Sequence, residues 1–263
     1  MSALRFPLRT AAFVGTTLGF YALFEVESAF TRRAQDQALL RKWMARYGRF
    51  LLELYGLEVI ASGRYVDAGQ RYPGSDERGL GRIFVMNHRS GLDIALTIGL
   101  FDAHIVSRAD LARWPLIGSA ARRAGTLFVD RKSTRSGATV LKAMGAAVKS
   151  GRGVMIFPEG TTFAGDEVRP FKPGAFQTAQ RTGAEIVPVG LAYDRDDVIF
   201  LDESFPTHLR RVSGIAHTRV GVAVGEALRP TGDPVELAGR AHESVQALVH
   251  RARASLTTSS RRT

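Results

Sequence analysis

Residues 87–93 read NHRSGLD and place a histidine five residues before an aspartate. An imidazole can take a proton from a hydroxyl group near neutral pH, and a carboxylate on one ring nitrogen fixes the tautomer that leaves the other nitrogen free. His88 is therefore a candidate general base, and Asp93 is the candidate carboxylate that orients it. The alternative interpretation is structural, because such residues near a helix start also serve as caps.

The residues on either side predict a turn between a strand and a helix. The apolar run at residues 82–86 predicts a short buried strand, and residues 92–100 predict an apolar helix. Ser90 and Asp93 have the spacing of a helix N-cap and its third residue, which would stabilise the turn. In such a turn, Asp93 can fold back toward the ring of His88.

Three later segments carry polar residues or proline at predicted strands. They read GTLFVDR at residues 125–131, FPEGTT at 157–162 and IVPVG at 186–190. Together with the histidine segment, these blocks resemble in type and order those of the glycerolipid acyltransferase family, typified by 1-acylglycerol-3-phosphate acyltransferases. The resemblance implies transfer of a fatty acyl group from acyl-CoA or an acyl carrier protein to the free hydroxyl of a lysolipid, with 1-acylglycerol-3-phosphate as the expected acceptor.

The resemblance also implies roles for single residues. His88 would deprotonate the acceptor hydroxyl, with Asp93 as its orienting partner, and Pro188 would belong to the block usually assigned to the acyl donor. The thioester is a co-substrate in this scheme, and no bound cofactor or metal is expected. The residues expected to bind the polar head of the acceptor are Gly125, Arg131, Glu159, Gly160, Thr161 and Lys172.

The third block departs from the family pattern in a way that concerns the acceptor. Members that act on lysophosphatidic acid commonly read FPEGTR, with the arginine attributed to phosphate binding, whereas this chain has Thr162 there. Arg131, Arg169 or Lys172 can supply the charge, because phosphate recognition requires cationic donors at no fixed sequence position. The FPEGTT form followed by PFKPGAF also resembles acyltransferases that use other lysolipids, including lyso-ornithine lipid, so both acceptors remain open.

Each of these residues also has a structural interpretation. Glu159 can cap a helix or pair with a neighbouring arginine, Arg131 can form a surface ion pair, and Pro188 can mark a sheet edge or a bulge. A non-catalytic lipid-binding protein with the same fold is a further alternative, which the intact pair of His88 and Asp93 opposes. A hydrolase is disfavoured because the chain has no G-x-S-x-G motif.

Composition narrows the class of protein. The chain has 263 residues, enough for one large domain or a domain with a small appendage, and its apolar fraction of 45% is typical of a globular protein. It has no cysteine, which excludes disulfides, zinc-thiolate sites and a thiol nucleophile. Its six histidines lack the spacing of metal ligands, and those other than His88 are assigned structural or surface roles.

The net charge of +11 is concentrated in clusters and bears on the partners. Basic residues gather at 32–49, 108–135 and 251–262. Such clusters suit anionic membrane lipids or an acidic acyl carrier protein. Nucleic acid is disfavoured, because the sequence has no zinc finger, basic zipper or RRM signature. The sequence does not indicate an oligomeric state.

The amino-terminal region predicts attachment to a membrane. Residues 10–24 form an uncharged stretch of 15 residues. As a helix it would be about 22 Å long, short of a hydrocarbon core of about 30 Å, so it is expected to lie in or dip into the bilayer. It also resembles a signal peptide, although no A-x-A cleavage site follows. Residues 32–55 predict an amphipathic helix whose apolar face packs on the core or lies on lipid. We expect peripheral or monotopic attachment at the cytoplasmic face of the cell membrane.

The remainder of the chain alternates short apolar runs with helical stretches. This alternation predicts an α/β fold with a mixed, mostly parallel sheet flanked by helices. The expected organisation is membrane-associated helices at 1–55, an acyltransferase domain at 56–256 and a flexible tail at 257–263, with an exposed loop at 65–80. The predicted strands are 57–61, 82–86, 104–107, 126–129, 153–157, 185–192 and 219–224; the predicted helices are 92–101, 110–124, 136–149, 175–182 and 233–256.

Overall fold

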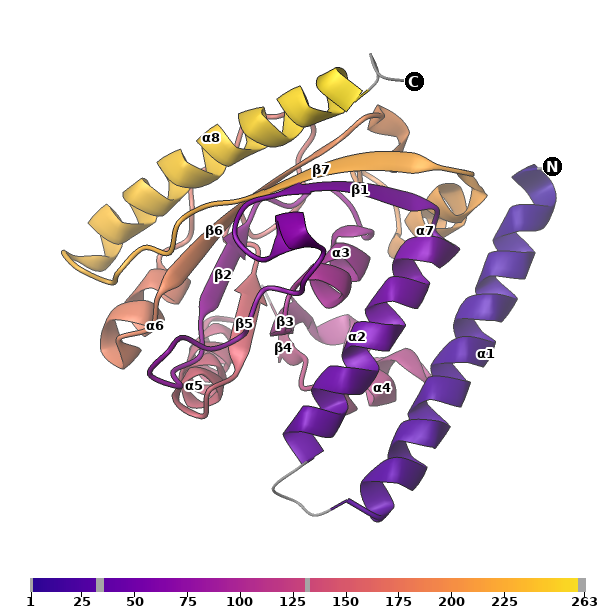
Figure 1. Cartoon of the computed structure of the whole chain (residues 1–263), viewed down its shortest axis with the longest axis horizontal. Helices are drawn as coiled ribbons and strands as arrows, with labels where there is room; N and C mark the ends of the chain where they lie inside the picture. The colour runs from indigo at the N-terminus through magenta and orange to yellow at the C-terminus, as the bar shows by residue number, and fades with distance from the viewer. Residues whose placement is uncertain (1, 32–35, 131–132, 260–263) are drawn as a thin grey trace.

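Two long amino-terminal helices lie side by side along one flank of a twisted sheet (Figure 1). The structure is a computed structural model that describes residues 2–31, 36–130 and 133–259. The first helix, α1 (Ser2–Ala29), is longer than the predicted stretch, and α2 (Asp36–Leu54) returns beside it. Of the helices described, none combines the length and the apolar character that crossing a membrane requires.

The sheet has seven strands in the order β1-β7-β6-β2-β5-β3-β4. Neighbouring strands are parallel except for β6 and β7, which confirms the predicted mixed, mostly parallel sheet. All seven strands fall where the apolar runs predicted them. Their bounds are β1 (Leu57–Ser62), β2 (Ile83–Met86), β3 (Ala103–Arg108), β4 (Leu127–Val129), β5 (Gly153–Ile156), β6 (Ile186–Tyr193) and β7 (Thr218–Val224).

Helices cover both faces of the sheet, which explains why its inner strands are apolar throughout. Because side chains alternate along a strand, Phe84 and Met86 of β2 enter one core cluster, while Ile83 and Val85 enter the other. The helices that complete the two layers are α3 (Asp93–Leu100), α4 (Ile117–Arg123), α5 (Thr134–Lys149), α6 (Gly174–Thr182), α7 (Phe205–Gly214) and α8 (Pro234–Ser259).

The helix α2 packs against protein, which decides between the two predicted surroundings of its apolar face. Leu39 and Leu51 are buried, and the helix approaches α3 so closely that a Cβ on Gly48 would lie 2.6 Å from the carbonyl oxygen of Ile98. Arg9 of α1 lies toward the same open end of the helix pair, and its guanidinium donates to carbonyl oxygens just after α7. Both helices of this α1–α2 hairpin are therefore fixed to the domain.

The structure differs from the predicted elements in four places. The helix expected at 110–124 is divided into a 3₁₀ helix, Ala109–Arg113, and α4, because Pro115 has no amide hydrogen to continue a helix. The loop at 65–80 is not simply exposed, since Val66 and Tyr72 are buried. The helix α7 was not predicted, and α8 continues to Ser259 into the expected tail, whose residues 260–263 lie outside the described part.

Candidate active site

His88 and Asp93 meet in the turn that joins β2 to α3, as their spacing predicted. Nδ1 of His88 lies 2.7 Å from Oδ2 of Asp93. The Asp93 side chain is fully buried, whereas 13% of the His88 side chain is exposed. This bond places the ring proton on Nδ1. No hydrogen bond to Nε2 is found among the described residues, so Nε2 is free to accept a proton.

The carboxylate of Asp93 accepts three further hydrogen bonds, which compensate for its burial. Oδ2 accepts from the backbone amides of Arg89, at 2.7 Å, and Ser90, at 3.0 Å. Oδ1 accepts from the hydroxyl of Tyr193, at 2.6 Å. Burial, followed by the charge of Asp93, raises the pKa of Tyr193 well above its ordinary value. Tyr193 therefore remains protonated and continues to donate to Asp93.

A second histidine supports the turn from the side of α7. His208 is fully buried, and its Nε2 accepts from the amide of Gly91 at 3.0 Å while its Nδ1 lies 3.1 Å from a carboxylate oxygen of Glu203. Burial lowers the pKa of His208, which favours the neutral ring that this arrangement requires. The predicted N-cap is wrong in detail: α3 begins at Asp93, and the Ser90 hydroxyl accepts from the amide of Leu92 instead.

The third sequence block lies directly under His88. The ring of Phe157 stacks on the imidazole, with 4.1 Å between centroids and 19° between planes. The carboxylate of Glu159 is fully buried, pairs with Arg89 at 3.0 Å and accepts from the amide of His88 at 2.7 Å. Since no part of this carboxylate reaches solvent, the geometry favours an orienting role for Glu159 over direct contact with an acceptor.

The rest of this block lies at the surface. Thr161 and Lys172 are exposed, and the ammonium group of Lys172 lies so close to Gly160 that a Cβ there would be 2.5 Å from Nζ. The structure thus brings these three predicted residues to one surface. Thr162 donates from its hydroxyl to the carbonyl oxygen of Phe200, at 2.5 Å, so its side chain is bound to the backbone.

A second exposed cation follows the block. The guanidinium of Arg169 lies 5.4 Å from the ring centre of Phe163, and its backbone amide donates to Glu159 at 2.9 Å. The backbone of Arg169 is therefore bonded to the block, and its side chain contacts the residue that follows the block. With Lys172, it provides positive charge on the exposed side of residues 157–163.

The structure does not bring Gly125 or Pro188 to this surface. Gly125 precedes β4, whereas His88 follows the carboxyl end of β2. Because β2, β5, β3 and β4 are parallel, the two residues lie at opposite ends of these strands. Its carbonyl oxygen pairs with Nδ1 of His104 at 2.8 Å. Pro188 is buried in the inner strand β6, where the register against the chain beyond β7 shifts by one residue, as at a bulge. Arg131 lies outside the described residues.

An apolar groove of about 510 Å³ extends from the motif turn between the helical hairpin and the domain. It begins at Gly91 and Leu92 and follows one side of α3 past Ile94 and Ile98 toward the start of β3. Aromatic residues of α1 and α2 form much of its other wall. The groove can therefore hold a long apolar chain with one end at the turn that carries His88.

Three supporting residues of this site were not anticipated. Tyr193 follows the IVPVG block at the end of β6, and the polar end of an otherwise apolar strand was a signal for it. Arg89 and Glu159 carry opposite charges in two different blocks, a pattern that suits a buried pair. For His208 we find no comparable signal, because α7 itself was not predicted.

Comparison with known proteins gives three informative matches. The family model described as acyltransferase matches residues 65–192. The lyso-ornithine lipid O-acyltransferase of Pseudomonas aeruginosa is 30% identical over 94% of each chain. The 1-acyl-sn-glycerol-3-phosphate acyltransferase of Neisseria meningitidis serogroup B is 26% identical over 85% of this chain and 95% of that relative.

The fold itself has a solved counterpart. The crystal structure of the 1-acyl-sn-glycerophosphate (LPA) acyltransferase PlsC from Thermotoga maritima superposes with a TM-score of 0.72, covering 97% of this chain and 98% of the other. The two chains are 20% identical, so this likeness concerns the fold alone. It includes the sheet and the helices that flank it.

Glu159→Gln is expected to destabilise the protein strongly, because it leaves the buried guanidinium of Arg89 without its counter-charge. Breaking a buried ion pair in this way costs about 3–5 kcal/mol in the free energy of unfolding, measurable by urea denaturation. Asp110→Asn, which breaks the exposed pair with Arg108, is the matched control and should cost about 1 kcal/mol or less. Equal losses in the two variants would contradict the supporting role of Glu159.

Proposed function

This chain belongs to the acyltransferase family and is an acyltransferase that acts on lysolipids, and we propose that it works at the membrane surface, with a lysolipid of the lyso-ornithine type as acceptor. The observation that carries the chemistry is the 2.7 Å contact between His88 and the fully buried Asp93. The donor is an acyl thioester, of either coenzyme A or an acyl carrier protein.

The proposed reaction is a direct transfer with His88 as the base. Nε2 takes the proton of the acceptor hydroxyl, and the oxygen attacks the carbonyl carbon of the thioester. The bond between carbon and sulfur then breaks, and the thiolate recovers the proton from His88. Asp93 holds the tautomer and stabilises the imidazolium ion that exists between these two proton transfers. No acyl-enzyme forms.

The groove supports this assignment because it would hold the acyl chain. It starts at Gly91 and Leu92, within the same turn as His88, so a chain lying in it would present its carbonyl group near the base. Its lining is almost entirely apolar, which suits a fatty acyl chain and not a polar headgroup. The headgroup of the acceptor would then lie on the outer side, near Lys172.

The acceptor is inferred from the third block. Thr162 stands where the resemblance expects an arginine for lysophosphatidic acid, and its hydroxyl is already bonded to Phe200. An ornithine headgroup carries a carboxylate and an ammonium group in place of a phosphomonoester, and it requires less positive charge. The relative from Pseudomonas aeruginosa, similar over 94% of both chains, is named for such an acceptor. Lysophosphatidic acid is the second candidate, which the exposed cations Arg169 and Lys172 favour.

Membrane attachment is inferred from the outer face of α1. Of the nine exposed large apolar side chains in the described structure, seven lie within residues 4–30. They include Leu8 and Leu18, which are 66% and 51% exposed, and neither of these two residues lines the groove. Such a face suits insertion into a bilayer surface, and the net charge of +11 would add attraction to anionic headgroups. Cytosolic acyl donors would place the protein on the cytoplasmic side of the cell membrane.

His88→Ala should lower kcat for acyl transfer by 10²- to 10⁴-fold, roughly the contribution of a general base. Asp93→Asn should be nearly as harmful, and Tyr193→Phe should have a smaller effect because it leaves the base in place. His217→Ala, at an exposed histidine, is the control. Initial rates with labelled acyl-CoA, compared at equal circular dichroism, test the assignment. Turnover near that of the wild type in His88→Ala would overturn it.

Thr162→Arg should raise kcat/KM for lysophosphatidic acid relative to lyso-ornithine lipid by about 10-fold, since it adds a charged donor for phosphate. Ala164→Arg adds the same charge nearby and should not change the ratio. The wild type should itself prefer lyso-ornithine lipid. If it prefers lysophosphatidic acid, and Lys172→Ala raises the KM for that acceptor selectively, the second candidate is correct.

The double variant of Leu8→Glu and Leu18→Glu should bind vesicles containing anionic lipids more weakly, because two charges would enter the apolar surface of the bilayer. Val235→Glu, at a similarly exposed apolar residue of α8, is the control. Sedimentation with vesicles at low and high salt measures the apolar and the electrostatic contributions to binding, because salt screens only the second. Unchanged sedimentation of the double variant would remove α1 from the membrane-binding surface.

A further inference from the structure

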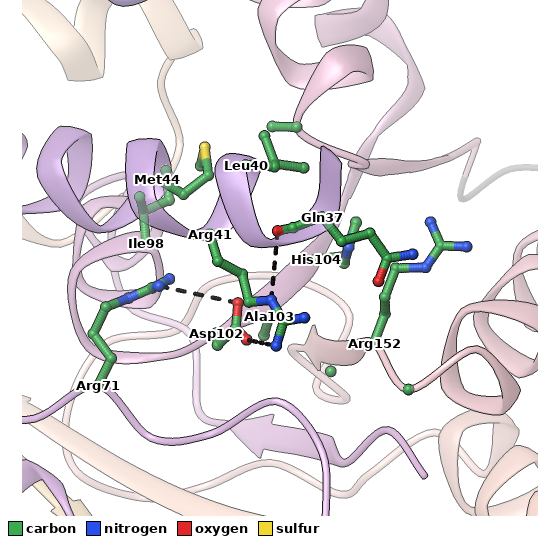
Figure 2. A pocket seen from close by; sticks show the side chains of 13 residues that line it. Gln37, Leu40, Arg41, Met44, Arg71, Ile98, Asp102, Ala103, His104 and Arg152 are labelled. Atoms are coloured by element: carbon green, nitrogen blue, oxygen red, sulfur yellow. Dashed lines mark hydrogen bonds and ion pairs between the residues drawn. The ribbon is translucent and has the colours of Figure 1, made fainter. Parts of the chain in front are cut away.

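A second, smaller pocket lies where the strands β3 and β5 begin, at the end of the sheet opposite His88. Figure 2 shows the side chains that line it. It has a volume of about 70 Å³ and is bounded by the first half of α2, the start of β3 and the start of β5. The side chains of Arg41, Arg71 and Arg152 line it, together with His104 and Asp102. The pocket lies at the amino-terminal ends of the parallel strands, whereas His88 lies at their carboxyl ends. A group bound in the pocket therefore cannot contact the reacting groups.

The positive charge in this pocket exceeds the negative charge. Asp102 is the only acidic residue among the lining residues that the structure describes. Its two ion pairs are long, at 3.7 Å to Arg41 and 4.0 Å to Arg71. Burial lowers the pKa of His104, which favours the neutral ring. The lining therefore carries one carboxylate and three arginines, of which Arg41 and Arg71 approach Asp102.

The charge and the hydrogen-bond donors of Arg71 are only partly matched by acceptors. Its Nε is buried and has no hydrogen-bond partner among the residues that the structure describes, although Nη2 donates to the carbonyl oxygen of Phe101. Burial also lowers the pKa of Arg71, which reflects the cost of keeping this charge away from water. A buried donor without a partner is costly. Nη1 of Arg71 lies 4.0 Å from Oδ1 of Asp102, beyond hydrogen-bond distance, so an oxyanion in the pocket would give this nitrogen a closer acceptor. A single water requires only about 10–15 Å³, so the pocket has room for a group of that kind.

The pocket lies next to the apolar groove. Leu40, Met44, Ile98, Ala103 and Ala124 line both of them. Beyond these shared residues, the lining changes from apolar in the groove to cationic in the pocket. A cationic pocket next to an apolar groove is complementary to a molecule with an anionic head and one apolar chain.

We propose that this pocket binds the oxyanion headgroup, a carboxylate or a phosphate, of a single-chain amphiphile whose chain enters the groove at the end away from His88. The guanidinium groups of Arg41 and Arg71 suit the planar or tetrahedral oxygens of such a head. The site is separate from the acceptor surface at Lys172, and it does not depend on the proposed acceptor.

Isothermal titration of the full-length protein with ligands below their micelle concentrations tests the proposal. Decyl phosphate and decanoate should each bind with a stoichiometry near one. Inorganic phosphate, which has no chain, and decanol, which has no charge, should bind at least about 10-fold more weakly. Inorganic phosphate that binds as tightly as decyl phosphate would overturn the role of the groove.

Variants locate the site. Arg71→Gln should weaken binding of decyl phosphate by about 10-fold or more, and Arg41→Gln, at a half-exposed residue whose loss spares the fold, should act in the same direction. Asp102→Asn should tighten binding, because it removes the competing carboxylate. Ala124→Leu, which narrows the junction, should weaken binding of decyl phosphate and leave inorganic phosphate unchanged.

Two controls distinguish this site from others. Arg108→Gln, at an exposed arginine outside the pocket, should leave binding unchanged. Lys172→Ala should also leave it unchanged, and loss of binding in that variant would assign the ligand to the acceptor surface and overturn the proposal. Unchanged affinity in both Arg71→Gln and Arg41→Gln would overturn it equally.

Discussion

The buried carboxylate of Asp93 is the group on which the catalytic end of the molecule depends. A charge so far from water costs several kcal/mol unless donors surround it. Two of its donors are amides of the turn itself, one is the ring of His88, and the fourth is Tyr193 on another strand. The pairing of β2 with β6 sets that last contact. The orientation of the base therefore depends on the register of the sheet as well as on its local turn.

Much of the fold, and the pairing of His88 with Asp93, could be predicted from the sequence, because both depend on residues that are close together in the chain. Each strand is an apolar run bounded by polar residues, and the spacing of His88 and Asp93 suits a turn. The contacts that complete the site are not local. Tyr193 reaches Asp93 from 100 positions along the chain, and His208 comes from a helix with no strong sequence signal. Burial of Glu159 likewise depends on Arg89, which belongs to another block.

The second block shows a different limit of sequence interpretation. Its first residue, Gly125, comes before the short strand β4, and Asp130 comes after it. Residues before and after a strand lie at opposite ends of that strand. A block that includes a whole strand therefore cannot place all of its residues in one site. Gly125 accordingly lies beside the cationic pocket and contacts His104. The sequence shows which residues are neighbours in the chain, but the direction of the strand determines at which end of the sheet each residue lies.

The pairing of β1 with β7 constrains how the chain acquires its structure during synthesis. Leu57 pairs with Thr218, so the edge of the sheet cannot close until most of the polypeptide has left the ribosome. The α1 and α2 helices emerge long before that moment, and the α1 surface remains apolar on both the groove side and the outer side. During this interval the hairpin has no completed domain to cover it. Early contact with a bilayer or a chaperone would shield it from aggregation until the last strands arrive.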